Sequence, residues 1–508
     1  MMSTHTAVRP GEPVKKGPII AALMIGAFVA ILNQTLMNVA LPSIMENLAI
    51  KPTVAQWLTT GFMLVNGVLI PVTAYLIARF STRQLFISAM LLFTIGTLVC
   101  AVSPNFASLL TGRLVQAAGA GILMPLMTVV FLNIFPVENR GKAMGMMGIA
   151  MIFAPAIGPT LSGYIVEHYD WRVLFYMILP FSVIATLIGI FFLKNVTEVS
   201  RPKLDMLAVI LSTLGFGGLL YGFSDAGNDG WSSTPVISTL AVGAVALILF
   251  VWRELKVKDP MLEFRIFRYN MFTLTTLINV IVTMAMYAGM ILLPIYLQQI
   301  RGFTPVESGL LMLPGAILMG IMSPITGAIF DRIGAKWLAV IGLAITVLTT
   351  WEFSNLSETM SYGMIMIIYT ARMFGMSMLM MPIQTAGLNQ LPRSLNAHGT
   401  AMSNTLRMIS GSIGTAILVT VMSTQAQSHG EALMKTGTFD PNNQADLLRL
   451  SHESTIYGIN YAFVIATWIA VASLILAFFI KKTKPAEEPA PSGTKESGYD
   501  DVNSTTTI

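Results

Sequence analysis

The fold is decided by the stretch NVALPSIMENLAIKPTVAQWLTTGFMLVNGVLIPVTAYLIARFSTRQLF (38–86), because it returns in altered form as MILLPIYLQQIRGFTPVESGLLMLPGAILMGIMSPITGAIFDRIGAKWLA (290–339). The offset between matching positions is almost constant. The matching residues are Pro42 and Pro294, Pro71 and Pro324, Ala74 and Gly327, Leu76 and Ile329, and Arg79 and Arg332. The second half of the chain therefore repeats the first, and the sequence predicts a duplicated fold with two related halves.

The composition places these halves in a membrane. Of the 508 residues, 54% are hydrophobic and only 11% are charged, and the mean hydropathy is +0.71. A soluble protein has about 25% charged residues, so these few charges cannot solvate the surface of a folded chain of this length. A spanning helix needs about 20 mainly apolar residues, and runs of that length recur from end to end. The sequence predicts an all-α integral membrane protein.

We predict fourteen transmembrane helices, six in each half and two in an inserted hairpin. The expected spans are 18–45, 54–77, 85–102, 107–132, 142–166, 171–193, 205–223, 234–253, 271–297, 306–330, 337–354, 360–386, 398–424 and 455–480. The expected domains are an N-terminal tail (1–17), a six-helix bundle (18–193), the hairpin (205–253), a second six-helix bundle (271–480) and a disordered tail (481–508). The outer segment 425–454 is left unassigned.

Lysine and arginine predict the orientation. Most of the 30 basic residues fall in the tails and in every second connection. Loops rich in these residues stay on the cytoplasmic side of a membrane. We therefore expect both termini to be cytoplasmic.

Several classes of function are excluded by what the chain lacks. The single cysteine, Cys100, rules out a disulfide within the chain, and no cluster of His and Cys has metal-ligand spacing. The only Gly-Lys pair, Gly141-Lys142, is followed by Ala143, so there is no phosphate-binding loop. We expect no enzyme activity, no cofactor, no metal and no nucleic-acid partner. Two halves with polar groups in mid-membrane favour alternating-access transport, and uphill transport would then use an ion or proton gradient.

Three segments carry a family resemblance. The segment SPITGAIFDRIGAK (323–336) resembles the loop signature of the major facilitator superfamily, LLTGRLVQAAGAG (109–121) its fourth-helix motif, and APAIGPTLSG (154–163) the fifth-helix motif that accompanies antiporters. Fourteen helices make the chain similar to EmrB/QacA-like drug:proton antiporters, and most similar to the lincomycin-resistance branch of Gram-positive bacteria. The resemblance implies a major facilitator fold, drug export and a bacterial plasma membrane. The first-half copy of the loop signature departs from it, with Ala78 in place of Asp and Ser81 in place of Gly.

Amides in the first span raise the question of substrate contact. Asn33 stands where many relatives carry an acid, and Gln34 and Asn38 share one helix face. An amide in hydrocarbon costs several kcal/mol unless it meets water or a partner. Lining a substrate cavity and holding helices together are therefore both open. The expected cavity residues are Asn33, Gln34, Asn38, Asn66, Gln116, Tyr287 and Asn404.

Proton exchange needs a group that titrates, and the helix interiors offer almost no acid. We expect Arg113 to sense protonation near the cavity, although a fixed structural bond is the alternative. The functional case for Arg372 and Arg407 is weaker, because reaching toward water is an alternative for either side chain. The candidate proton carriers are Glu307, Asp225 and Asp205. Solvated loop acids and helix caps are the alternatives for these three.

The loop signature predicts a gate. We expect Asp331 to favour a helix N-terminus, that of the next helix, and Arg332 and Lys336 to pair with acids across the interface between the halves. Ala78 then predicts a lock on one side only. Gly158 and Pro159 are expected to give close helix packing and a hinge. The expected gating residues are Gly327, Asp331, Arg332, Gly334, Lys336, Gly158 and Pro159.

These observations predict a monomeric, proton-coupled exporter of amphipathic compounds or antibiotics that works by alternating access among membrane lipids. The lack of mid-membrane acids favours neutral or modestly charged substrates over dications. Export of an endogenous metabolite or signalling molecule is the first alternative. A transport-inactive membrane sensor or interaction protein is the second.

Overall fold

A computed structural model describes residues 16–55, 57–197, 199, 205–436, 439–440 and 443–481. Most of the two predicted tails lies outside these residues. Within the described part, fourteen helices are long and apolar enough to cross a membrane, as the sequence predicts. The protein is therefore an all-helical, multi-pass membrane protein.

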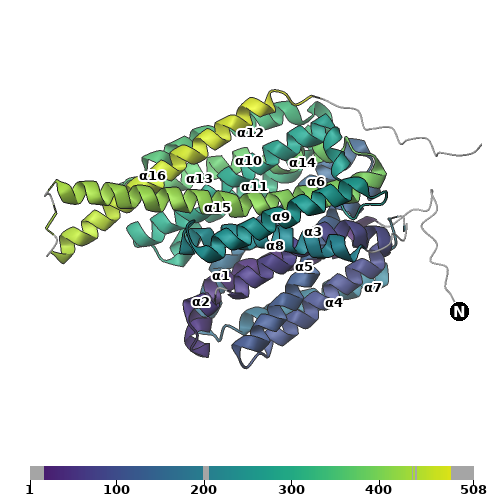
Figure 1. The fold of residues 1–508 in the computed structure, drawn as a ribbon, viewed down its shortest axis with the longest axis horizontal. Coiled ribbons are helices and arrows are strands. Elements are labelled where there is room, and N and C mark those ends of the chain that lie inside the picture. The colour runs from purple at the N-terminus through teal and green to yellow at the C-terminus, as the bar shows by residue number, and fades with distance from the viewer. Residues whose placement is uncertain are drawn as a thin grey trace, which may run out of the picture.

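The α-helices follow one another with short connections (Figure 1). They are α1 (Lys16–Leu48), α2 (Pro52–Ala55), α3 (Trp57–Arg79), α4 (Thr82–Ala101), α5 (Phe106–Ile134), α6 (Arg140–His168), α7 (Val173–Phe192), α8 (Met206–Asp229), α9 (Thr234–Lys256), α10 (Asn270–Ile295), α11 (Pro305–Ile333), α12 (Ala335–Glu352), α13 (Tyr362–Ser377), α14 (Met380–Leu388), α15 (Asn396–Lys435) and α16 (Gln444–Ala477). Short helical turns are η1 (Val137–Asn139), η2 (Phe264–Arg268), η3 (Tyr296–Ile300), η4 (Phe353–Asn355) and η5 (Arg393–Leu395). We call the end of the bundle where α1 begins and α16 ends the basic end, and the opposite end the far end.

Helices are the expected solution because hydrocarbon offers no partner to a backbone N–H or C=O. Polar residues at the ends of spans then satisfy the first N–H groups of several helices. Ser81 and Gln84 form a capping box at the start of α4, and Asn105 accepts a hydrogen bond from the N–H of Ser108 at the start of α5. These caps fix where the spans begin.

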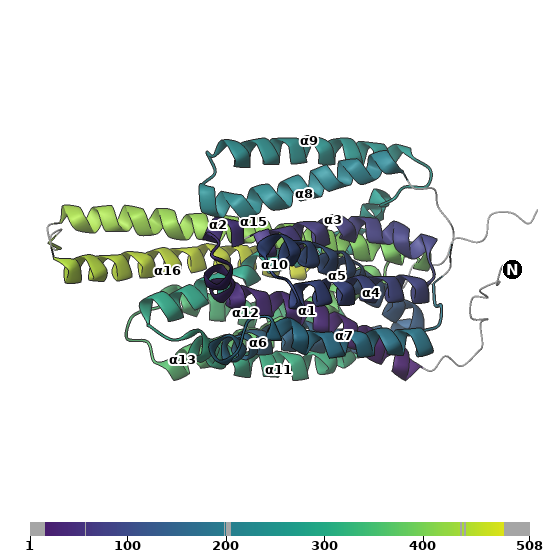
Figure 2. The ribbon, with the colours of Figure 1, turned by 90° about the horizontal axis from the view of Figure 1, so that it is seen from below.

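The buried side chains fall into three apolar clusters. One is built from α1 to α7, with Met381 of α14 added to it. A second is built from α10 to α16 with η3 and η4. The third joins the α8–α9 hairpin to side chains of α3, α5, α10, α14 and α15. Figure 2 shows this hairpin stacked beside α3 and α15, with α9 outermost.

The last two spans are longer than the sequence predicts. α15 continues to Lys435 and α16 already begins at Gln444, so most of the unassigned segment 425–454 is helical. The two extensions project together beyond the rest of the far end (Figures 1 and 2). His429 and Tyr457 stack between them with ring centroids 4.0 Å apart. The outer segment therefore forms a projecting helical hairpin.

The predicted span at 360–386 is interrupted. α13 ends at Ser377 and α14 begins at Met380. Proline has no N–H and clashes with the carbonyl four residues earlier, and Pro382 stands four residues after Met378, where the helix breaks. The methionine-rich stretch around this break is largely inside the protein, because Met376 is 1% exposed and Met381 is 4% exposed.

We expect the Gly119→Ala variant to be less stable than the wild type. A Cβ at Gly119 would lie 2.8 Å from the backbone nitrogen of Phe93 and against the carbonyl oxygen of Ala89. Such overpacking typically costs about 1–3 kcal/mol. Thermal melting of the detergent-solubilised protein measures the effect. Gly363→Ala is the control, since nothing lies within 4 Å of its added Cβ. Equal melting temperatures for both variants would show that α4 and α5 do not pack this closely.

Candidate transport site

A fully buried cluster of polar side chains joins α1, α4 and α5. Arg113 of α5 is 0% exposed, and its Nη1 donates to Gln116 Oε1 at 3.1 Å. Asn33 Nδ2 of α1 donates to the same oxygen at 3.2 Å. Gln116 Nε2 donates in turn to Thr97 Oγ1 of α4 at 2.8 Å. Asn33 therefore bonds to a neighbouring helix, and no carboxylate takes part in the hydrogen bonds described for this cluster.

The remaining contacts of Arg113 join α5 to α3. Its Nε donates to the carbonyl oxygen of Leu58 at 3.3 Å, and its guanidinium lies 4.3 Å from the centroid of the Phe62 ring. Its Nη2 has no hydrogen-bond partner. A guanidinium in a membrane interior must be compensated by partners of this kind. Arg113 is thus held by Gln116 of its own helix and by α3, and its Nη2 is left without a partner.

Arg372 of α13 takes the place of Arg113 in the second half. α4 packs closely on α5 at Gln116, and α12 packs closely on α13 at Gly375, so each arginine lies one turn before the contact. Arg372 is 0% exposed, and its Nη2 donates to the carbonyl oxygen of Ala285 at 2.9 Å. Its Nε and Nη1 have no partner. Arg372 therefore does not reach water, because α10 and α13 enclose it.

The other expected cavity residues lie in different surroundings. Gln34, Asn66 and Tyr287 are each partly exposed. Asn404 of α15 is 6% exposed, and its Nδ2 has no hydrogen-bond partner. The side chain of Asn38 lies outside the described part. The structure thus brings Asn33, Gln116 and Arg113 together in one cluster and does not place the remaining residues in it.

A carboxylate from one half caps a helix of the other at the basic end. Asp331 Oδ1, at the end of α11, accepts from the N–H of Gly141 at 2.7 Å, and its Oδ2 accepts from the N–H of Lys142 at 2.9 Å. Both N–H groups belong to the first turn of α6, where the helix dipole favours a negative charge. Asp331 therefore caps a helix N-terminus, as the sequence predicts. The capped helix is α6 and not the following α12, because the chain turns away at Gly334 with φ 84°.

Close approach of α6 and α11 makes this cap reachable. A Cβ on Gly327 would meet the backbone of Gly141, and one on Gly145 would lie 2.8 Å from Pro324 Cα. Toward the far end, a Cβ on Gly309 would lie 3.0 Å from Thr160 Oγ1. The two helices are therefore in contact along most of their length.

The other predicted gating contacts, those of Arg332 and Lys336, are not formed in the part of the chain that the structure describes. Arg332 is exposed, and neither it nor Lys336 forms an ion pair within the described residues. The expected pairing across the interface is therefore not seen, since the Arg332 side chain extends into solvent. Arg140 instead donates through Nη1 to Asn389 Oδ1 at 3.0 Å, which adds a second link between the halves.

The motif of α6 packs against α1. A Cβ on Gly158 would meet Thr35 Oγ1, which leaves no room for a larger residue there. Ser162 Oγ donates to the carbonyl oxygen of Leu36 at 2.7 Å. The helix runs unbroken through position 159, and the side chain of Pro159 lies outside the description. The motif therefore packs α6 closely against α1, and Gly158 and Ser162 present no free polar group to a ligand.

The repeated position in the first half has no equivalent cap. By the repeat, α15 corresponds to α6 and would be capped by residue 78, which is Ala78. The N-cap of α15, Leu395, makes no side-chain hydrogen bond. Both side-chain polar atoms of Asn396, the first residue of α15, have no partner. Among the described residues the carboxylate cap is therefore one-sided.

The candidate proton carriers have structural partners. Glu307 is exposed and forms a capping box with Thr304 at the start of α11. Asp205 caps α8 and lies 2.8 Å from the Arg253 guanidinium, whose hydrogen bond lowers the pKa of the carboxyl. Asp225 is partly buried in α8.

Sequence reasoning missed one acid. Glu254, in the last turn of α9, is 1% exposed and accepts from the N–H of Leu262 at 2.9 Å. It lies just beyond the predicted span 234–253 and next to Arg253, so the sequence carries no signal that it is buried.

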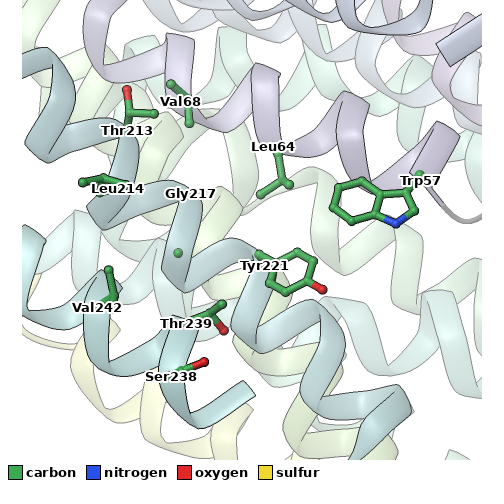
Figure 3. A pocket seen from close by; sticks show the side chains of 11 residues that line it. Trp57, Leu64, Val68, Thr213, Leu214, Gly217, Tyr221, Ser238, Thr239 and Val242 are labelled. Atoms are coloured by element: carbon green, nitrogen blue, oxygen red, sulfur yellow. The ribbon is translucent and has the colours of Figure 1, made fainter. Parts of the chain in front are cut away.

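An apolar pocket of about 520 Å³ lies between α3, α8 and α9 (Figure 3). Trp57 and Tyr221 stack at one side of it, with ring centroids 5.8 Å apart. Ser238 and Thr239 also line it, but both hydroxyls already donate to the carbonyl oxygen of Pro235. The other lining residues are Leu64, Val68, Thr213, Leu214, Gly217, Gly218 and Val242. The pocket can hold hydrocarbon, and none of its lining residues is charged.

Comparison with known proteins identifies the class. Residues 23–415 match the model of the Major Facilitator Superfamily, and the chain belongs to this family of membrane transporters. It is 44% identical to "Lincomycin resistance protein LmrB" of Bacillus subtilis, over 95% of this chain and 99% of the relative. It is 30% identical to "Multidrug export protein EmrB" of Escherichia coli, over 86% of each chain. The human organic anion transporter MFSD10 shares the fold, with a TM-score of 0.63, 12% identity, and coverage of 92% of this chain and 100% of the other. The predicted resemblance and the transporter class are confirmed.

We expect Asp331→Asn to loosen the basic end. The amide can replace only one of the two charged acceptors, and a hydrogen bond to a charged group contributes about 1.5–3 kcal/mol. The closed form should therefore lose about 10- to 100-fold in population. Maleimide labelling of Ser323→Cys, in a Cys100→Ser background, reports opening because Ser323 is 2% exposed and packs on Gly145.

Arg332→Gln is the matched control, since Arg332 is exposed on the neighbouring position. Its labelling rate should equal that of the parent. If the Asp331→Asn protein labels no faster than this control, the cap does not hold the two halves together.

Proposed function

We propose that this transporter exports amphipathic organic compounds, antibiotics among them, in exchange for protons entering a bacterial cell. Two relatives that the chain matches over most of its length are named for lincomycin resistance and multidrug export, which supports drug export here. The excess of lysine and arginine at the basic end supports a cytoplasmic position for that end and for both termini. The working unit we propose is a monomer in the plasma membrane, surrounded by lipid.

One observation carries the proposed mechanism, which is the cap of Asp331 on the first turn of α6. It joins the two halves of the repeat through two hydrogen bonds at one end of the bundle. Such bonds exist in one state of a rocking bundle and are absent in the other. Their strength, a few kcal/mol in total, suits a switch because a ligand or a proton can shift an equilibrium of that size.

Alternating access then follows because the basic end is closed by hydrogen bonds between the two halves. With the basic end closed by Asp331 and by the Arg140–Asn389 bond, substrate leaves toward the far end. When these bonds break, the first turn of α6 becomes exposed to water, which replaces the lost acceptors. Arg113 and Arg372 stay within their own halves, because Arg113 is held by α3 and by Gln116 of α5, and Arg372 is held by α10. They serve to keep each half rigid while it moves.

The proton carrier we propose is Asp225, with Glu254 as the second candidate. Asp225 is partly buried in α8 near the far end of the hairpin. Glu254 of α9 is 1% exposed and lies near the basic end of the hairpin. Burial disfavours the charged form of a carboxyl, which is the property a proton carrier needs. Glu307 and Asp205 fit this role less well, because Glu307 is exposed to solvent and Asp205 is paired with Arg253. The hairpin would then contribute to coupling.

Proton flux in liposomes tests the export proposal. Addition of drug to vesicles with an imposed pH difference should release protons across the wild-type protein. Asp225→Asn or Glu254→Gln should abolish drug-driven flux while substrate still binds, and Glu307→Gln should retain it. A response to one native metabolite alone would favour a metabolite exporter. No response to any compound, or equal transport without a pH or voltage difference, would refute the proposal.

The pH profile of transport should be unchanged by Asp205→Asn. The Arg253 hydrogen bond holds the pKa of Asp205 below its ordinary value of 3.8. A lowered pKa means that the contribution of this carboxylate to stability is present above the ordinary value and is lost as pH falls through the lower folded value. Asp205 is therefore ionised throughout pH 5–8. Flux measured across this window should keep the wild-type midpoint, and a displaced midpoint would assign proton coupling to Asp205.

A further inference from the structure

Arg407 of α15 differs from the other two arginines inside the spans. Arg113 has two acceptors and an aromatic ring, and Arg372 has one acceptor. For Arg407, the described residues supply no hydrogen bond and no ion pair. Among the described residues, these three guanidiniums are therefore not paired with any carboxylate.

The depth of Arg407 makes this unusual. At about 1.5 Å per residue, Arg407 lies about 16 Å along α15 from Asn396, near the middle of a hydrocarbon layer about 30 Å thick. Its side chain is half-buried in the protein. A charge at this depth normally faces a partner or a wet space.

The neighbours of Arg407 are polar and face the same side of α15. The ring and hydroxyl of Tyr287 of α10 lie against Gly411, one turn further along α15 from Arg407. Asn404, nearly one turn before Arg407, is 6% exposed with an unpartnered Nδ2. Residues three and four apart lie on one helix face. The face therefore presents donors in excess of acceptors.

We propose that Arg407, Asn404 and Tyr287 form a subsite for an anionic group, a carboxylate or sulfonate, on an amphipathic substrate. This rests on the proposed export function and assigns its substrate a charge. A guanidinium fork with an amide and a phenol beside it matches the acceptors of such an anion. The ligand then supplies the negative charge that the described residues do not. The substrate class becomes acidic amphiphiles.

Three probes that share a dansyl group test this charge preference. Dansylglycine is an anion, dansylamide is neutral and dansylcadaverine is a cation. Binding to the full-length protein in nanodiscs is followed by energy transfer from tryptophan. The wild type should bind dansylglycine more tightly than dansylamide. Arg407→Gln should weaken dansylglycine by about 10- to 100-fold, the loss typical of a charged hydrogen bond, and change dansylamide less than about threefold.

Further variants separate recognition from folding. Asn404→Asp places a carboxylate beside Arg407, so it should weaken dansylglycine and strengthen dansylcadaverine. Arg407→Lys keeps the charge without the fork and should fall between wild type and Arg407→Gln. Arg449→Gln, at an exposed position on the projecting part of α16, is the control and should bind all three probes as the wild type does. Melting temperatures verify that the variants fold.

Equal weakening of all three probes by Arg407→Gln, or a wild-type preference for dansylcadaverine, would overturn the subsite. These measurements need no pH difference. A failure of proton-driven export would therefore leave these binding results unchanged. If drug-driven proton flux is observed but Arg407→Gln does not weaken dansylglycine binding, the subsite alone is overturned.

Discussion

Hydrocarbon supplies no hydrogen-bond partners, so each polar group inside the spans depends on another part of the protein. The three interior arginines meet this constraint to different degrees. Arg113 is compensated by Gln116, by the carbonyl of Leu58 and by the Phe62 ring. Arg372 has a single carbonyl acceptor. The number of partners around each guanidinium, rather than its charge alone, separates a structural arginine from one that is available to a ligand.

The same constraint explains why the duplicated halves are no longer equivalent. The first turn of α6 receives a carboxylate from α11, whereas the matching position for α15 holds Ala78. A helix start without an acidic partner relies on water or on weaker contacts. Asn396 has no partner for either polar atom of its side chain in the closed form. One interface is thus held by charge and the other mainly by packing, which concentrates the energetic difference between the two states at α6 and α11.

Two elements lie outside the duplicated core and enlarge it in different directions. The α8–α9 hairpin lies beside α3 and α15, forms an open apolar pocket with α3, and brings Glu254 into the interior. The extended α15 and α16 project beyond the far end, where their polar sequence would meet water and not lipid (Figure 2). The core therefore sets the transport geometry, and the additions change what surrounds it.

The sequence by itself determined the all-helical membrane fold, the fourteen spans and the family, because hydropathy and the internal repeat are written along the chain. It also anticipated that Asp331 meets a helix start and that Ala78 removes the equivalent in the first half. Only the tertiary structure decided that Asp331 caps α6, that Asn33 bonds to Gln116, and that Arg372 is enclosed. Each of these pairings joins helices far apart in sequence, and close packing at glycines selects the partner. Local periodicity fixes a helix and its apolar face, but the neighbour that a polar side chain reaches depends on how the helices cross.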